Sequence, residues 1–219
     1  MTLSAVVFVL DETLAIPRRK RGTILTDAMA SIDAPTPTRQ EYRNAHGRHL
    51  TGDTRAPIFS EIFENYDADT DPDVAATAYR EEIAASLVPV ADAELLIDRL
   101  RERYRVGLLT NGPIVAQRDK IETLGWADLF DETVVTGELS AGKPDSRAFE
   151  AILGSLSVPA AEAVYVGDQV RTDVHGAKDT GMRAIQVLYD GGPEPDDRAD
   201  AHVDRATLAT KLPAALGAM

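Results

Sequence analysis

Polar side chains directly follow two of the short apolar runs in this sequence. Asp11 comes after AVVFVL, and Thr110 and Asn111 close the run VGLLTN. A hydroxyl group and free backbone N–H groups at the end of a strand suit the oxygens of a phosphate. Each pattern in isolation also fits an ordinary turn after a strand, so neither alone predicts a binding site.

Charged side chains occupy two further positions of this kind. Lys143 stands between glycine and proline in SAGKPD, where its ammonium could neutralise a phosphate as a point charge. Asp168 follows the run YVG, and Asp173 comes shortly after it at the expected start of a helix. These two carboxylates either cap the helix or hold a hard cation such as Mg²⁺. Because like charges repel, we expect a cation or a basic side chain beside them.

Strand-like and helix-like segments alternate along most of the chain. Apolar runs predict strands at 5–9, 106–110, 132–136, 163–167 and 184–188, with helices at 92–104, 114–124, 146–156 and 172–180. Strands separated by helices form a parallel sheet with helices on both faces. The sequence therefore predicts an α/β fold, a three-layer doubly wound parallel sheet of five strands. The polar residues fall at the carboxyl ends of the strands, where such sheets bind ligands.

Residues 15–89 interrupt this alternation. The segment contains no convincing strand and at least three helical patterns, which begin after Thr38, at Ile58 and behind Asp71-Pro72. A helical insert that leaves the sheet after its first strand and returns before its second is expected to form a cap domain. The predicted organisation is an α/β core of residues 1–14 and 90–219 with an α-helical cap of residues 15–89.

The composition limits the kinds of partner. With 36 acids against 23 bases the net charge is −13, which argues against nucleic acid. No apolar run is long enough to span a membrane, and the apolar start is not followed by a signal-peptide cleavage site. The absence of cysteine excludes disulfides and fits a cytoplasmic protein. An acidic chain with only five lysines is also typical of halophilic organisms.

The four polar motifs, in this order and on these predicted elements, resemble those of the haloacid dehalogenase (HAD)-like hydrolase superfamily. Its first motif reads FDLDGTL or FDLDDTL, and residues 8–14 here read FVLDETL. TNG at 110–112 resembles the second motif, Lys143 in GKPD the third, and Gly167-Asp168 with Asp173 the fourth. The position of the insert resembles that of a helical C1-type cap.

The resemblance implies a Rossmann-like core and a two-step hydrolysis of phosphate monoesters. In active members the first aspartate of the first motif attacks phosphorus, and the second, here Asp11, acts as acid and base. Thr110 and Asn111 would bind the phosphoryl oxygens, and Lys143 would offset their charge. The implied cofactor is Mg²⁺, held by Asp168 and by the backbone carbonyl at Asp11, and Asp173 would support either the metal site or Lys143.

One position departs from the family pattern. Val9 stands where the nucleophilic aspartate is expected, so both the nucleophile and one anionic metal ligand are missing. Loss of a covalent nucleophile commonly costs on the order of 10⁴- to 10⁶-fold in rate. Two alternatives keep a role for Asp11: a shifted register in which it is the nucleophile, or direct attack by water with Asp11 as general base.

The sequence thus predicts a HAD-family phosphatase by descent, acting on a small phosphorylated molecule, with weak or lost turnover. One alternative is a non-catalytic protein that binds a phosphate ligand or a partner in the same cleft. A 2-haloacid dehalogenase is a third possibility, although it needs the same missing carboxylate.

Three other features invite a functional interpretation. The basic run 18–21 could attract an anionic substrate into the cleft, although a solvated helix start that pairs with nearby acids is the simpler explanation. His46 and His49 lack a third ligand at metal spacing, and Trp126 fits a packing role.

Overall fold

The structure is a computed structural model that describes residues 2–219. Its main sheet has six parallel strands in the order β5-β4-β1-β6-β7-β8. Their bounds are β1 Ala5–Phe8, β4 Arg105–Thr110, β5 Glu132–Val135, β6 Ala163–Gly167, β7 Arg183–Leu188 and β8 Ala201–Asp204. The predicted α/β class and parallel sheet are confirmed, and the five predicted strands are all present.

The sixth strand, β8, corrects the predicted strand count. It pairs with β7 at the edge of the sheet, with Ile185 opposite Ala201. Its sequence AHVD has a single buried residue, Val203. An edge strand this short needs no apolar run, and so the sequence carries no strand signal there.

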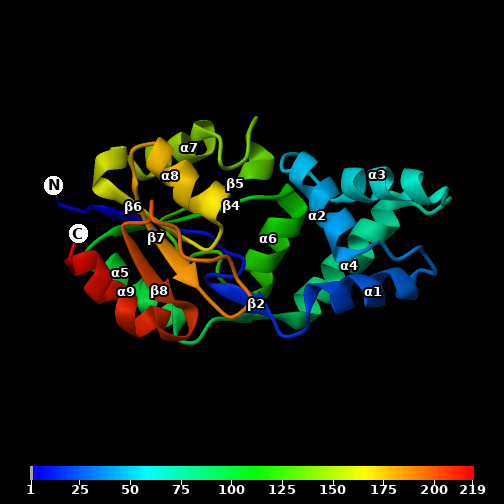
Figure 1. The fold of residues 1–219 in the computed structure, drawn as a ribbon, viewed down its shortest axis with the longest axis horizontal. Helices are drawn as coiled ribbons and strands as arrows, with labels where there is room; N and C mark the ends of the chain where they lie inside the picture. The colour runs from blue at the N-terminus through cyan, green and yellow to red at the C-terminus, as the bar shows by residue number, and fades with distance from the viewer. Residues whose placement is uncertain (1) are drawn as a thin grey trace.

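Helices cover both faces of the sheet, as Figure 1 shows, with α5 and α9 on one side and α7 and α8 on the other. The α-helices of this core are α5 Ala93–Arg101, α6 Ile114–Thr123, α7 Ser146–Leu156, α8 Gly176–Asp179 and α9 Leu208–Gly217. Short 3₁₀ turns lie at Thr136–Glu138, Ala160–Glu162 and Arg205–Thr207, and a π-helical turn, η3, spans Val170–His175. Side chains of β1 alternate between the two layers: Val6 and Phe8 pack on one side, Ala5 and Val7 on the other.

Four helices, α1 Arg21–Ser31, α2 Arg39–Arg48, α3 Ala56–Tyr66 and α4 Pro72–Ser86, form what we call the helical insert. It has an apolar cluster of its own, including Ile24, Phe59 and Tyr79. Helix α2 begins at Thr38 with a capping box to Glu41. Helix α1 begins at Arg21, within the basic run 18–21 where a helix start was one expectation.

A short antiparallel ribbon connects the insert to the core (Figure 1). Strand β2, Ala15–Pro17, pairs with β3, Leu87–Pro89. The expectation that residues 15–89 contain no strand was therefore wrong. Three-residue strands with a proline at one end give almost no periodic signal, and the pairing is visible only in three dimensions.

The order of the strands places a ligand crevice beside β1. From β1 the chain continues through β4 to β5 on one side and through β6 to β7 on the other. Parallel sheets bind ligands at the carboxyl ends of the strands where this reversal occurs. Among residues 2–219, no helix combines the length and apolar character required to cross a bilayer.

Candidate phosphate-binding site

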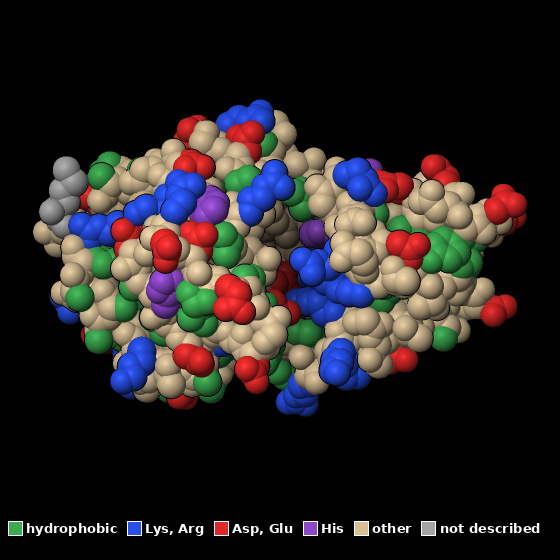
Figure 2. Space-filling view, viewed as in Figure 1, with side chains coloured by type: hydrophobic (Ala, Val, Ile, Leu, Met, Phe, Trp, Pro, Cys, Tyr) green, Lys and Arg blue, Asp and Glu red, His purple; other side chains and the backbone are tan. Residues whose placement is uncertain are grey.

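A cavity of about 650 Å³ opens at the carboxyl ends of β1, β4 and β6, beneath the helical insert. Figure 2 shows the hollow between the core and the insert, with Lys and Arg side chains gathered on the insert side. The structure brings every residue proposed from the sequence to this cavity: Val9, Asp11, Thr110, Asn111, Lys143, Asp168 and Asp173.

Lys143 and Asp173 form a fully buried ion pair, with side chains 1% and 2% exposed. The Lys143 Nζ donates to Asp173 Oδ1 at 2.7 Å and to the Tyr165 hydroxyl, which donates in turn to the Leu109 carbonyl at 2.8 Å. Asp173 lies in the π-helical turn η3, a distortion that is frequent at functional sites. The basic partner that the two acids required is therefore Lys143, paired with Asp173.

Close packing of Asp173 requires a glycine at position 167. A Cβ atom on Gly167 would lie 2.6 Å from Asp173 Oδ2. The same oxygen accepts a hydrogen bond from the Gln169 backbone N–H at 3.0 Å. The glycine of the fourth motif thus has a steric role, because it lets the carboxylate approach the end of β6.

Thr110 and Asn111 lie at the end of β4 but use their side chains differently. The Asn111 amide holds the Lys143 main chain, donating to its carbonyl and accepting from its N–H, both at 2.9 Å. Only the main chain of Asn111 is then left for a phosphate oxygen. The Thr110 hydroxyl, 1% exposed, donates to Gln117 Oε1 at 3.3 Å, a long hydrogen bond that a ligand could replace.

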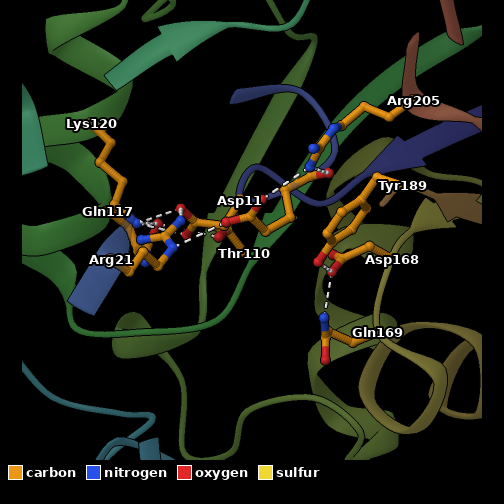
Figure 3. A network of polar contacts seen from close by, with 10 residues as sticks. Asp11, Arg21, Thr110, Gln117, Lys120, Asp168, Gln169, Tyr189 and Arg205 are labelled. Carbon is orange, nitrogen blue, oxygen red and sulfur yellow. Dashed lines mark hydrogen bonds and ion pairs between the residues drawn. The ribbon is translucent and has the colours of Figure 1, made fainter. Parts of the chain in front are cut away.

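The carboxylate of Asp11 is held by two cations (Figure 3). Lys120 Nζ lies 2.8 Å and 2.6 Å from its two oxygens, and Arg21 Nη2 lies 2.8 Å from Oδ1. Burial alone would raise the pKa of Asp11, but Lys120 and Arg21 outweigh it and lower the pKa far below its usual value. Burial also lowers the pKa of Lys120 to about 8, against the opposing effect of Asp11. Asp11 is therefore ionised throughout the physiological range.

A second polar chain runs from Glu12 to Asp168. Arg205 donates to the Glu12 carboxylate at 3.0 Å and stacks over Tyr189, with its Cζ 4.0 Å from the ring centroid. The Tyr189 hydroxyl donates to Asp168 Oδ2 at 3.2 Å, and the Gln169 amide donates to the same oxygen (Figure 3). Burial and the nearby Asp173 raise the pKa of Asp168 to about 7. This carboxylate thus lies in the cleft without an ion-pair partner among residues 2–219.

The acids predicted to hold Mg²⁺ are not assembled as a metal site. Within the described chain, no three His, Cys, Asp or Glu side chains gather in a geometry that could ligate a cation. The Asp11 side chain is bound to Lys120 and Arg21, and Asp173 to Lys143, so among the predicted metal ligands only the Asp168 carboxylate has no ion pair. Val9 supplies no oxygen. One free carboxylate does not make a protein-built Mg²⁺ site, although Mg²⁺ also binds through phosphate oxygens and water.

Val9 lies at the end of β1, 7% exposed, and lines the cavity beside Asp11. It packs with residues of the α7 and α8 layer such as Leu109 and Phe149. The residue predicted to stand at the nucleophile position is therefore apolar and offers no lone pair to the cavity.

Two residues that contact Asp11 or Thr110, Lys120 and Gln117, escaped the sequence reasoning. Gln117 and Lys120 lie one turn apart on α6, so QRDK at 117–120, on the helix that follows TNG, carried the signal. Arg21 belongs to the basic run 18–21, whose arginines have different surroundings. Arg19 pairs with Asp27 and Glu82, as the ion-pair explanation holds, whereas Arg21 reaches the cavity.

The remaining candidates have structural roles. Trp126 is 2% exposed in the core, and its indole N–H donates to Glu94 at 2.8 Å. His49 contacts Glu61 at 3.0 Å. His46 lines the cavity, and burial beside Arg55 and Lys120 lowers its pKa to about 3, so it is neutral above acid pH.

The sequence profile of the haloacid dehalogenase-like hydrolase family matches residues 6–187. The chain belongs to this family. Among curated relatives, a glyceraldehyde 3-phosphate phosphatase of Methanopyrus kandleri is 31% identical over 175 residues, 76% of this chain and 71% of that protein. A phosphoserine phosphatase of Thermus thermophilus is 35% identical over 148 residues, 67% of this chain and 58% of that protein.

Solved structures agree with the fold. A HAD phosphatase from Thermococcus onnurineus superposes with a TM-score of 0.69 at 24% identity, over 96% of this chain and 98% of that one. A 2-haloacid dehalogenase from Pseudomonas syringae gives 0.70 at 24% identity, over 99% of both chains. At this identity the likeness shows the fold alone. The sequence relatives, by contrast, support a phosphatase of the family.

Proposed function

We propose that this protein binds a small phosphate monoester in the cleft and has lost most of the hydrolytic turnover of its family. The observation that carries the proposal is the pairing of an intact anion site with an apolar residue at the nucleophile position. Lys143, Thr110 and the main chain of Asn111 surround one pocket, and Val9 lies beside it.

Charge in the cleft supports a phosphate ligand. Seven of the side chains that line the cavity are Lys or Arg and four are Asp or Glu, on a chain whose net charge is −13. A surface that is acidic elsewhere and basic in one hollow concentrates an anion there. Absence of a carboxylate at position 9 removes one negative charge that would repel the ligand.

The state of Asp11 supports reduced turnover. A general acid must be protonated to donate to the leaving group, and Lys120 and Arg21 hold Asp11 as a carboxylate. With no nucleophile at position 9, the expected loss of rate is on the order of 10⁴- to 10⁶-fold. The remaining donors still stabilise charge on the phosphoryl group, so a slow rate above that in water is expected.

Mg²⁺ has no step in this proposal. Asp168 is the residue that would contact such an ion, together with phosphate oxygens of the ligand and water. Binding of the ester is attributed to the protein's own donors and cations.

The deciding experiment compares the natural protein with Val9→Asp on a generic phosphomonoester in the presence of Mg²⁺. Val9→Ala is the matched control, since it opens the same space without a carboxylate. We expect the natural protein and Val9→Ala to bind the ester with little hydrolysis, and Val9→Asp to gain at least about 100-fold in rate. Rapid metal-dependent hydrolysis by the natural protein, abolished in Asp11→Asn, would instead identify Asp11 as the nucleophile or base.

A further inference from the structure

The insert side of the cavity contains a buried arginine whose donors are unused. Arg55 is 5% exposed, and its Nε and Nη1 have no hydrogen-bond partner among residues 2–219. Its guanidinium packs over the ring of Tyr79, with Cζ 5.3 Å from the ring centroid. An unpaired charge is costly to bury, so a protein that keeps one is expected to supply its partner from a ligand.

A second unused donor lies in the same wall. Tyr42 is 3% exposed, and its hydroxyl also has no partner among the described residues. Its ring lies 4.9 Å from that of Tyr79, and Arg39 Cζ lies 5.5 Å from the Tyr42 centroid. All of these residues line the cavity. Two buried donors without acceptors, with Arg39 next to one of them, are suited to bind an anion.

This group differs from the phosphate site on the core. Lys143 and Lys120 are already paired with Asp173 and Asp11, whereas the Arg55 group has no acid in its hydrogen-bonding shell. The phosphate donors come from the end of β4 and from the loop before α7 that carries Lys143, and the Arg55 group comes from α2 and the start of α3. Figure 2 shows Lys and Arg side chains collected on this insert side of the hollow.

We infer that the ligand of this protein carries two anionic groups: the phosphate ester held by the core, and a carboxylate or second phosphate held by Arg55 and Tyr42. This inference rests on the proposed function and narrows its substrate class. The planar guanidinium and the phenol hydroxyl can together donate several hydrogen bonds to one such group. Neutral sugar or polyol phosphates would leave these donors unsatisfied, and the site would discriminate against them.

The test measures binding of ligand pairs that differ in one group. 3-Phosphoglycerate against glycerol 3-phosphate tests a carboxylate, and fructose 1,6-bisphosphate against fructose 6-phosphate tests a second phosphate. We expect the natural protein to prefer the doubly anionic member of at least one pair by about tenfold or more. Arg55→Met should reduce that preference to about twofold, and Tyr42→Phe should reduce it partly.

Two controls separate ligand recognition from folding. Arg103→Met removes an exposed arginine over Tyr104, 5.8 Å from its centroid, and should leave the preference unchanged. Arg55→Met should raise the melting temperature of the ligand-free protein, because it removes an unpaired buried charge; a purely structural arginine would give a lower one. If Arg55→Met does not fold, Tyr42→Phe still tests the preference.

Equal affinities within both pairs would overturn the second anion site while leaving the phosphate proposal intact. An unchanged preference in both Arg55→Met and Tyr42→Phe would also overturn it. Failure of the natural protein to bind any of the four esters would overturn the proposed function itself.

Discussion

The Lys120 ammonium lies 2.6 Å and 2.8 Å from the two carboxylate oxygens of Asp11. Asp11 follows β1, the first strand of the sheet, and Lys120 lies on α6, so this pair joins segments 109 residues apart. Arg21 of the insert completes the group from the other side. Asp11, the predicted acid/base residue, is thus part of an ion-pair cluster in the cleft.

The first prediction concerns the strength of this cluster. Asp11→Asn leaves Lys120, 3% exposed, without its anion, whereas Lys120→Met leaves Asp11 with Arg21. Because the Asp11 side chain is itself 26% exposed, we expect Asp11→Asn to lower the free energy of unfolding by about 1–3 kcal/mol. This is less than the loss expected when a fully buried pair is broken. Lys120→Met should cost less. Urea unfolding of both variants and of the double variant gives the coupling energy.

The exposed pair Arg118–Glu138, with side chains 44% and 35% exposed, is the control for this cycle. Its coupling should be about 0.5 kcal/mol or less. Coupling of Asp11 with Lys120 no larger than that of the control pair would contradict the prediction.

The second prediction concerns pH. Burial, opposed by Asp11 and assisted by Arg55 and Arg21, lowers the pKa of Lys120 to about 8. As pH rises through 8 the cleft loses a positive charge, so affinity for a phosphate dianion should fall about threefold to tenfold between pH 7.5 and 9.5. Ligand titration contributes little in this window. Calorimetric Kd values in the natural protein and in Lys120→Met provide the measurement.

Lys120→Met should flatten this profile, and an equally steep profile in the variant would assign the titration to another group. Deprotonation of Lys120 affects stability in the opposite direction from ligand affinity. Between about pH 8 and the ordinary lysine pKa of 10.5, the unfolded chain binds more protons than the folded one. The Lys120 contribution to the free energy of unfolding therefore rises with pH in that range.

Much of the fold follows from local sequence patterns. Buried strands such as Ala163–Gly167 are short apolar runs with polar turns on both sides, and this signal is independent of the rest of the chain. Strand β8 and the β2/β3 ribbon carry no such signal, because their pairing depends on neighbours distant in sequence.

The residues of the site also differ in whether the sequence predicts them. Asp11, Thr110 and Asp168 follow from their positions after strands, and Lys143 follows from its place in the loop GKPD; the fold brings all four to one cavity. The hydrogen-bond partners of these side chains do not follow from local sequence patterns. That Asn111 clamps the Lys143 backbone depends on the path of two loops. Arg55 is one of many arginines in the sequence, and only burial without a partner distinguishes it.

The third prediction concerns Mg²⁺. With Val9 at the end of β1 and Asp11 paired, Asp168 is, within residues 2–219, the one carboxylate of the cleft without an ion pair. Addition of Mg²⁺ should therefore change the phosphate-ester Kd of the natural protein by less than about twofold. Val9→Asp restores an anionic ligand, and its Kd should improve by about tenfold or more with Mg²⁺.

Calorimetric measurement of the phosphate-ester Kd with Mg²⁺ and with EDTA tests this prediction. Val9→Asn is the control, because it adds a polar side chain without a charge. A strong Mg²⁺ requirement for binding in the natural protein would show that Asp168 and the ligand suffice for the ion.

The last prediction concerns how tightly the fourth motif is packed. A Cβ atom on Gly167 would lie 2.6 Å from Asp173 Oδ2 and 2.7 Å from its Cγ, so Gly167→Ala must displace this carboxylate. Asp173 holds Lys143 at 2.7 Å, and the displacement should move the ammonium as well. We expect a loss of about 1–3 kcal/mol in the free energy of unfolding and weaker binding of inorganic phosphate. Gly154→Ala is the matched control, because a Cβ atom on this glycine of α7 meets nothing within 4 Å, and it should stabilise the protein by up to about 1 kcal/mol. Urea unfolding and phosphate calorimetry on the two variants measure both effects. Equal behaviour of the two alanine variants would mean that Asp173 and Lys143 can shift freely, and that their buried pair does not fix the phosphate site.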